Sequence, residues 1–215
     1  MYSQDQLTTF DPHASTHMDA PQAARREEII DAARNLYEEK GMSHTSIQDI
    51  TTRIGVTRSL FYHYFPNKEA VTSAVLDTYV ADFVEAVHYW DSERRVGEIE
   101  DALSSVVRLL RLGLFDNDTF RIALASRENA ALYIEFINRV ADRIATYMES
   151  HTVRDYGALH EVRITHVYET FYMLFIGLAS FLRQHPDVDD DVLKDLIAQT
   201  LHMDREPSAQ ARSSE

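Results

Sequence analysis

The chain has 215 residues, a length that allows one large or two small domains. It contains no cysteine, which excludes disulfides, thiolate metal sites and thiol catalysis. Its formal net charge of −14 at pH 7 is unfavourable for a nucleic-acid binder unless the acidic residues lie away from the binding surface. The N-terminal segment has neither the basic start nor the apolar run of a signal peptide, and no segment reaches the ~18 consecutive apolar residues of a membrane span. We therefore expect a soluble, cytoplasmic protein.

The beginning of the chain divides into a tail and a helix. Residues 1–20 show no periodicity and are expected to form a disordered tail. A helix is predicted over about residues 23–40, because Ile29, Ala33 and Leu36 recur on one face and a glycine follows. This apolar face is expected to pack on the segment that comes next.

Residues 45–69, TSIQDITTRIGVTRSLFYHYFPNKE, predict two short helices joined by a tight turn. Ser46 is a candidate N-cap of the first helix, and Asp49, three positions later where Glu or Gln is usual, can complete a capping box. Gly55 supplies the backbone freedom that ends this helix, and Thr57 can cap the second helix, over about 57–65. A helix, a glycine-containing turn and another helix form the pattern of a helix-turn-helix.

The second helix of this pair has an apolar side and a polar side. Its positions off the apolar side hold hydrogen-bond donors, which are Arg58, Ser59, Tyr62 and His63. Such donors suit contacts to DNA phosphates and to base edges in the major groove. A small helical hairpin with a polar outer face has the same spacing, so the spacing alone leaves DNA binding open.

The segment GVTRSLFYHYFPNKEAV closely resembles the recognition-helix segment of the tetracycline-repressor (TetR) family of transcriptional regulators. That family has a Gly-Val turn, a Tyr-x-Tyr-Phe run, and then Pro, a small polar residue, Lys and Glu. Here these residues are Gly55, Val56, Tyr62, Tyr64, Phe65, Pro66, Asn67, Lys68 and Glu69. The resemblance covers about residues 25–79. Leu60 and Thr51 stand where the family usually has a small residue and Ala, and neither departure breaks the motif.

The resemblance implies a homodimeric transcriptional regulator, most often a repressor, that binds a palindromic operator and is released by a small-molecule effector. It implies neither catalysis nor a cofactor. Base contacts carried over by position are assigned to Gln48, Arg58, Ser59 and His63. Phosphate contacts are assigned to Thr45, Ser46, Thr57, Tyr62, Tyr64 and Lys68.

The acidic residues are unevenly distributed along the chain. Residues 21–70 carry seven basic and seven acidic residues, whereas residues 71–215 carry 14 basic and 25 acidic ones. A neutral head can still present a basic face to DNA if its acidic side chains point elsewhere.

After the helix-turn-helix, apolar periodicity predicts further helices and no strands. The predicted ranges are 67–90, 98–115, 119–150 (one broken or two consecutive helices), 158–184 and 188–203. The expected fold is all-α. Its expected parts are a disordered tail (1–20), a three-helix DNA-binding domain (21–66), a helical effector-binding and dimerisation domain (67–203) and a polar tail (204–215).

The helix predicted over 158–184 is apolar or small on every side between residues 171 and 182. A helix of this kind must be buried on all sides, and one chain of this size covers one side. We therefore expect the last two helices of two chains to form a four-helix interface, with a monomer around a buried central helix as the alternative.

The effector pocket is expected between the helices of the second domain. Aromatic candidates for its wall suggest an apolar or aromatic effector. They are Tyr133, Phe136, Tyr168, Tyr172 and Phe175.

Two other classes of protein remain open on the residues alone. A helical metal-dependent enzyme needs clustered carboxylates and histidines on facing helices, and the single Glu85-x-x-His88 motif has no second copy. A protein-interaction bundle would use the head for docking and would show no sequence-selective affinity for DNA.

Overall fold

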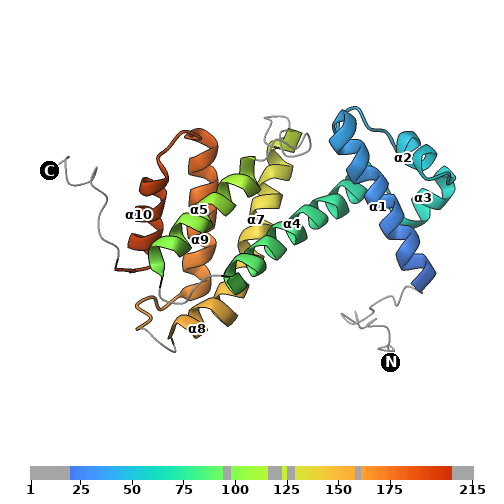
Figure 1. Ribbon diagram of the computed structural model, residues 1–215. Coiled ribbons are helices and arrows are strands. Elements are labelled where there is room, and N and C mark those ends of the chain that lie inside the picture. Colours follow the sequence, from blue (N-terminus) through green and yellow to red (C-terminus); the bar gives the residue numbers. More distant parts are fainter. Residues whose placement is uncertain (1–19, 94–97, 116–122, 125–128, 158–160, 205–215) are drawn as a thin grey trace, which may run out of the picture.

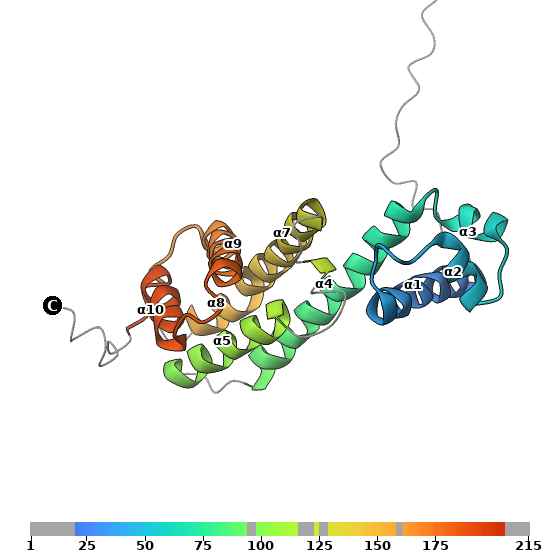
Figure 2. The same cartoon turned by 90° about the horizontal axis from the view of Figure 1, so that it is seen from above.

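The computed structural model describes residues 20–93, 98–115, 123–124, 129–157 and 161–204. All regular elements within these ranges are helical, so the predicted all-α class is confirmed. The helices form two lobes joined by one long helix (Figures 1 and 2). Residues 1–19 and 205–215, which include nearly all of the two predicted tails, lie outside the described part of the chain.

The first lobe, here called the head, contains α1 (Ala20–Lys40), α2 (Ile47–Arg53) and α3 (Arg58–Tyr64). Helix α1 buries its predicted stripe, with Ile29 and Ala33 fully enclosed. Two glycines of the head have positive φ angles, +86° at Gly41 and +66° at Gly55. L side chains rarely adopt this conformation, and it allows the chain to leave α1 and to turn between α2 and α3.

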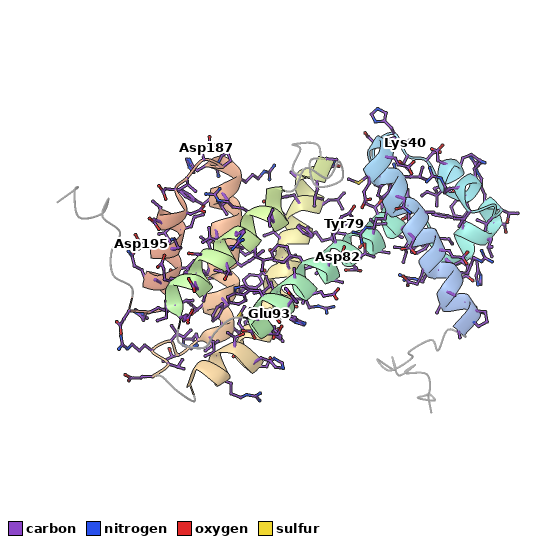
Figure 3. All side chains as sticks on the ribbon, in the orientation of Figure 1. Lys40, Tyr79, Asp82, Glu93, Asp187 and Asp195 are labelled. Carbon is purple, nitrogen blue, oxygen red and sulfur yellow. The ribbon has the colours of Figure 1, made fainter. Side chains whose placement is uncertain are left out.

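Helix α4 (Lys68–Glu93) belongs to both lobes (Figure 1). Its contact with the head is polar as well as apolar: Arg34 of α1 donates a hydrogen bond to Asp82 of α4 over 2.6 Å. The Arg34 guanidinium also lies 4.2 Å from the centre of the Tyr79 ring. Figure 3 shows Tyr79 and Asp82 on the stretch of α4 between the lobes. The helix is therefore held firmly to the head.

The second lobe, here called the body, consists of the rest of α4, α5 (Ile99–Phe115), α7 (Ala130–Tyr147), the π-helical turn η2 (Met148–Thr152), α8 (Val153–Gly157), α9 (Val167–Gln184) and α10 (Asp190–Thr200). Helices α7 and α9 pack side by side, and α10 lies against α5 and α9 (Figures 1 and 2). Apolar side chains from these helices form a continuous core, in which the Phe83 and Phe175 rings meet edge to face at 5.8 Å.

Two predicted helix boundaries in the body are wrong. The helix predicted over 158–184 begins at Val167, and residues 161–166 are not helical. Residues 162–165 read VRIT, and three β-branched side chains in four positions disfavour a helix. The helix predicted to end near residue 150 continues through η2 and α8 to Gly157.

The described residues contain neither a helix that could cross a membrane nor a group of three or more potential metal ligands. Glu85 and His88, the pair considered above, are both exposed on α4. The His88 ring packs against Tyr147, with the two ring centres 4.0 Å apart.

Candidate nucleic-acid interface

The N-terminus of α2 is fixed by the predicted capping box. Ser46 Oγ accepts a hydrogen bond from the Asp49 backbone N–H (3.2 Å), and Asp49 Oδ2 accepts one from the Ser46 backbone N–H (2.7 Å). Asp49 also forms an ion pair with Lys40 at 3.0 Å. Hydrogen bonds from Ser46 and from Lys40 hold the pKa of the Asp49 carboxyl well below its usual range. The charge of this carboxylate is therefore compensated within the head.

Helix α3 is capped by Thr57, whose Oγ1 accepts a hydrogen bond from the Leu60 backbone N–H over 3.2 Å. Its Phe61 side chain is fully buried in the head, and this anchor determines which side of α3 faces outward. The outward side carries Arg58, Ser59, Tyr62 and His63, all of them exposed. Tyr62 is 53 % exposed although it is a large aromatic residue, and its ring meets the Phe61 ring edge to face.

Helix α3 lies at the end of the head that points away from the body (Figures 1 and 2). The excess of acidic residues lies in the segment after residue 70. The exposed side of α3 is therefore separated from most of the negative charge of the chain.

Ion pairs within the head compensate most of its basic residues. Five of the seven basic residues between positions 21 and 70 have a carboxylate partner: Arg25 with Glu28, Arg26 with Glu27, Arg34 with Glu38 and Asp82, Lys40 with Asp49, and Arg53 with Glu39. In the part of the chain that the structure describes, Arg58 and Lys68 form no such pair. Glu69 follows Lys68 directly, so the uncompensated positive charge is that of Arg58, at the start of α3.

Of the other predicted contacts, Ser46, Gln48 and Thr57 are exposed, while Tyr64 is half-buried against the head core. Gln48 donates a hydrogen bond to Thr52 Oγ1 on the same face of α2, at 3.1 Å.

Thr45 departs from the expected surface position. Its side chain is only 2 % exposed, and Oγ1 donates to the carbonyl oxygens of Gly41 (2.9 Å) and Leu36 (3.3 Å). This hydroxyl ties the end of α1 to the start of α2 and does not face a possible phosphate. Lys68 is half-buried, its Nζ donates to the Met42 carbonyl oxygen at 2.7 Å, and burial lowers the pKa of its ammonium group.

The body contains a mostly apolar cavity of about 180 Å³, lined from α4, α5, α7, η2, α8, α9 and α10 and from residues 161–164 and 201–203. Of the five predicted pocket residues, Phe175 lines this cavity. The sequence interpretation missed the contribution of α4 and α5, including Phe83, Trp90 and Leu103. The apolar faces of these two helices were visible in the sequence, but nothing in it indicated that they enclose a space.

The other four predicted pocket residues are not part of the cavity wall. Phe136 is buried in the core. Tyr168 and Tyr172 stack on each other and donate hydrogen bonds to Asp142 (2.8 Å) and Asn138 (3.2 Å) of α7. The Tyr133 ring lies beneath the Arg183 guanidinium, 4.3 Å from the ring centre. The three tyrosines thus form polar contacts at the seam between α7 and α9.

This geometry defines a helix-turn-helix protein with a helical body. Residues 29–75 match the family model of bacterial regulatory proteins of the tetR family. The repressor Rv3405c of Mycobacterium tuberculosis strain H37Rv is 35 % identical over 88 residues, which are 41 % of this chain and 45 % of that protein. The resemblance of the head to the TetR family is thereby confirmed. The chain spans less than half the length of the curated relatives that it matches, 29 % in one case and 49 % in another.

Solved structures extend the likeness to most of the chain. The TetR family repressor AlkX from Dietzia sp. strain DQ12-45-1b has a TM-score of 0.61 at 20 % identity, covering 82 % of this chain and 95 % of that chain. RolR in complex with resorcinol has a TM-score of 0.57 at 21 % identity, covering 89 % and 92 %. These similarities establish the shared fold.

Proposed function

We propose that this protein is a sequence-specific DNA-binding transcriptional regulator, and a repressor as is most usual in the TetR family. The proposed DNA-binding domain is the head, residues 21–66, and the proposed effector-binding and dimerisation domain is the body, residues 67–203. The observation that carries the proposal is the arrangement of α3. This capped helix buries Phe61 and exposes a cation and several hydrogen-bond donors at the far end of the molecule.

In the proposed complex, α3 enters the major groove of the operator. Arg58, Ser59 and His63, with Gln48 from α2, contact base edges. Phosphate contacts are assigned to Ser46, Thr57, Tyr62, Tyr64 and Lys68. Lys68 donates one ammonium proton to the Met42 carbonyl oxygen and keeps two others, so it can still donate a hydrogen bond to a phosphate. Thr45 is left out because its side chain is buried.

The proposed regulator is a homodimer that forms through α9 and α10. In the single chain, α9 exposes Met173 (66 %) and Phe181 (37 %), and α10 exposes Val192 and Leu196. A second copy of the chain would cover this apolar surface. The two copies of α3 would then contact successive major grooves of a palindromic operator, about 34–36 Å apart.

The proposed effector binds in the body cavity and releases the DNA by changing the spacing of the two heads. Helix α4 is suited to this coupling, because Phe83 and Trp90 line the cavity while the preceding turns of the helix contact α1. A ligand shifts the spacing only if it binds one arrangement more tightly than the other. The complex of RolR with resorcinol gives an example of a similar fold that holds a small molecule.

The first test is binding to a fluorescent duplex that carries the DNA upstream of the protein's own gene, with a random duplex for comparison, at two salt concentrations. We expect selective binding that weakens with salt. The variant Tyr62→Ala with His63→Ala should lose the selectivity. Tyr89→Ala is the matched control, because it removes a tyrosine of α4 that is 68 % exposed and remote from α3.

Weak and equal binding of every protein to both duplexes would count against this upstream operator. A genome-wide selection that also returned no preferred sequence would then contradict the proposed function and favour the protein-interaction bundle.

A further inference from the structure

The cavity wall is apolar except at a few positions. Glu161, Arg163 and His202 contribute to it, but all three residues are exposed and so belong to its open side. The Trp90 indole N–H donates to Ser105 Oγ at 2.7 Å and is therefore satisfied by the protein. Thr152 is the remaining polar residue of the wall.

Thr152 lines this wall, and its hydroxyl is unusual among the described residues. Its Oγ1 atom is buried and has no hydrogen-bond partner, and it is the single side-chain nitrogen or oxygen of this kind among the described residues. A buried hydroxyl without a partner destabilises a fold, so its presence requires an explanation. A ligand that forms a hydrogen bond with Thr152 in the cavity provides one.

Thr152 is the last residue of the π-helical turn η2. Serine and threonine in helices often donate to the carbonyl four residues earlier. Ser150 of the same turn does so to the Thr146 carbonyl oxygen, whereas the buried Thr152 hydroxyl has no partner. At the end of η2 the backbone is wider, and the Val153 N–H bonds to the Met148 carbonyl oxygen, five residues earlier. Thr152 lies in this wide turn. Such turns occur frequently at functional sites.

The size of the cavity limits the ligand. Its volume of about 180 Å³ is close to that of an engineered apolar cavity of about 150 Å³ that binds benzene in another protein. An ionised ligand would lose its hydration without a counter-charge from the buried part of this wall. The expected occupant is therefore small and uncharged.

We propose that the cavity binds a neutral molecule with a single-ring-sized apolar part and one hydroxyl group, which forms a hydrogen bond with Thr152 Oγ1. This inference rests on the proposed function, because it specifies the chemical class of the effector. Thr152 would act as the specificity-determining residue: the apolar wall accepts the ring, and the hydroxyl distinguishes an alcohol or phenol from a hydrocarbon.

The test uses phenol and toluene, which share a ring and differ by a hydroxyl in place of a methyl group. Trp90 is the only tryptophan in the chain and lines the cavity, so its fluorescence reports occupancy directly. Each probe is titrated into the full-length wild type, Thr152→Val and Thr152→Ser, with excitation at wavelengths where the probes absorb weakly. The preference for phenol over toluene should fall by about tenfold in Thr152→Val and persist in Thr152→Ser.

An unchanged preference in Thr152→Val, with circular dichroism showing a folded variant, would overturn the inference, as would the absence of binding of both probes to the wild type. Operator binding is measured on the same preparations. Failure of the proposed ligand class can then be told apart from failure of the proposed regulatory function. A Thr152-dependent preference for phenol without any effect on DNA binding would support the ligand class and contradict effector release. Selective DNA binding by a protein that binds neither probe would contradict the ligand class alone.

Discussion

The head and the body differ in how their helices are positioned. In the head, α2 and α3 both begin at a residue whose side chain caps the helix, Ser46 and Thr57. In the body, α7 and α9 begin at Asn129 and His166, and neither side chain caps its helix, whereas Asp189 caps α10. Local signals therefore define both short helices of the proposed DNA-binding surface, whereas the position of α7 and α9 depends on packing between distant segments. This difference is consistent with the proposed function, in which the head presents a fixed surface to DNA and the body accommodates a ligand.

The two lobes are connected through a short stretch of α4. Arg34 of α1 bonds to Asp82 on this stretch, and Arg139 of α7 bonds to Asp77 (2.6 Å) and to Ser73 Oγ (2.8 Å). One arginine from each lobe thus holds residues 73–82. A displacement of α4 in the body would be transmitted to the head along the same helix.

The largest difference between the lobes should appear on removal of a core anchor. Phe61→Ala empties a fully buried site in a head with a small core, and we expect a cost of about 3–5 kcal/mol in the free energy of unfolding. The head should lose hydrogen-exchange protection and DNA binding while the body keeps its protection. Leu182→Ala, at a fully buried site of the body, should reduce hydrogen-exchange protection in the body and leave that of the head unchanged. Equal loss of protection in both lobes for each variant would contradict their separate stabilities.

A charge placed on the exposed apolar surface of the body should weaken the proposed dimer. Met173→Asp on α9 is expected to weaken the proposed dimer by at least about a hundredfold, since a carboxylate would be buried without a partner. Sedimentation velocity at several concentrations measures this change. Ile134→Asp on α7 is the matched control, because Ile134 is 59 % exposed and lies outside the proposed interface. A wild type that sediments as a monomer at every concentration would rule out the homodimer.

The body cavity should be sensitive to a single added methyl group. A Cβ atom at position 113 would lie 1.8 Å from Phe83 Cε2, so Gly113→Ala must displace a ring that lines the cavity. We expect a cost of about 1–3 kcal/mol in stability and weaker phenol binding, with DNA contacts retained. Urea unfolding and the Trp90 titration measure the two effects.

Gly177→Ala serves as the control for this substitution. Apart from the adjoining residues and the backbone of α9 itself, nothing in the described single chain lies within 4 Å of the added Cβ, on the exposed side of α9. In the single chain the change should stabilise the helix by about 0.5–1 kcal/mol, because alanine is the better helix former. Phenol binding that is unaffected by Gly113→Ala would show that Phe83 is not part of the ligand site.

The smallest effect is expected at the exposed cap of α2, and it depends on pH. The pKa of Asp49 is lowered in the folded protein, so its ionised form stabilises the fold above the ordinary aspartate pKa of about 4. This contribution decreases as the pH falls from there through the lowered pKa. The stability difference between wild type and Asp49→Asn should therefore be largest near neutral pH and shrink in acid.

Urea unfolding near pH 7 and about pH 3 measures this trend. Asp31→Asn is a suitable control, since Asp31 is exposed and has no ion pair among the described residues. A stability difference for Asp49→Asn that stays constant over this range would show that the carboxylate charge does not contribute.

The sequence by itself determined the geometry of the head surface. Ser46, Gly55 and Thr57 act on backbone groups within four residues of themselves, so their effects can be read from the order of residues. Helical periodicity is also a local pattern, so it predicted the all-α class from the order of residues. The side of α3 that faces outward followed from the position of Phe61 among its neighbours.

The tertiary structure decided what depends on contacts between distant segments. The burial of Thr45 against α1 and the pairing of Arg53 with Glu39 were not visible in the local pattern. The cavity wall was predicted from aromatic residues of α7 and α9, yet it also contains α4, α5 and Thr152 of the π turn. A cavity is space that several helices leave between them, and no single helix specifies it. The proposed effector site therefore became apparent only once the helices had been packed together.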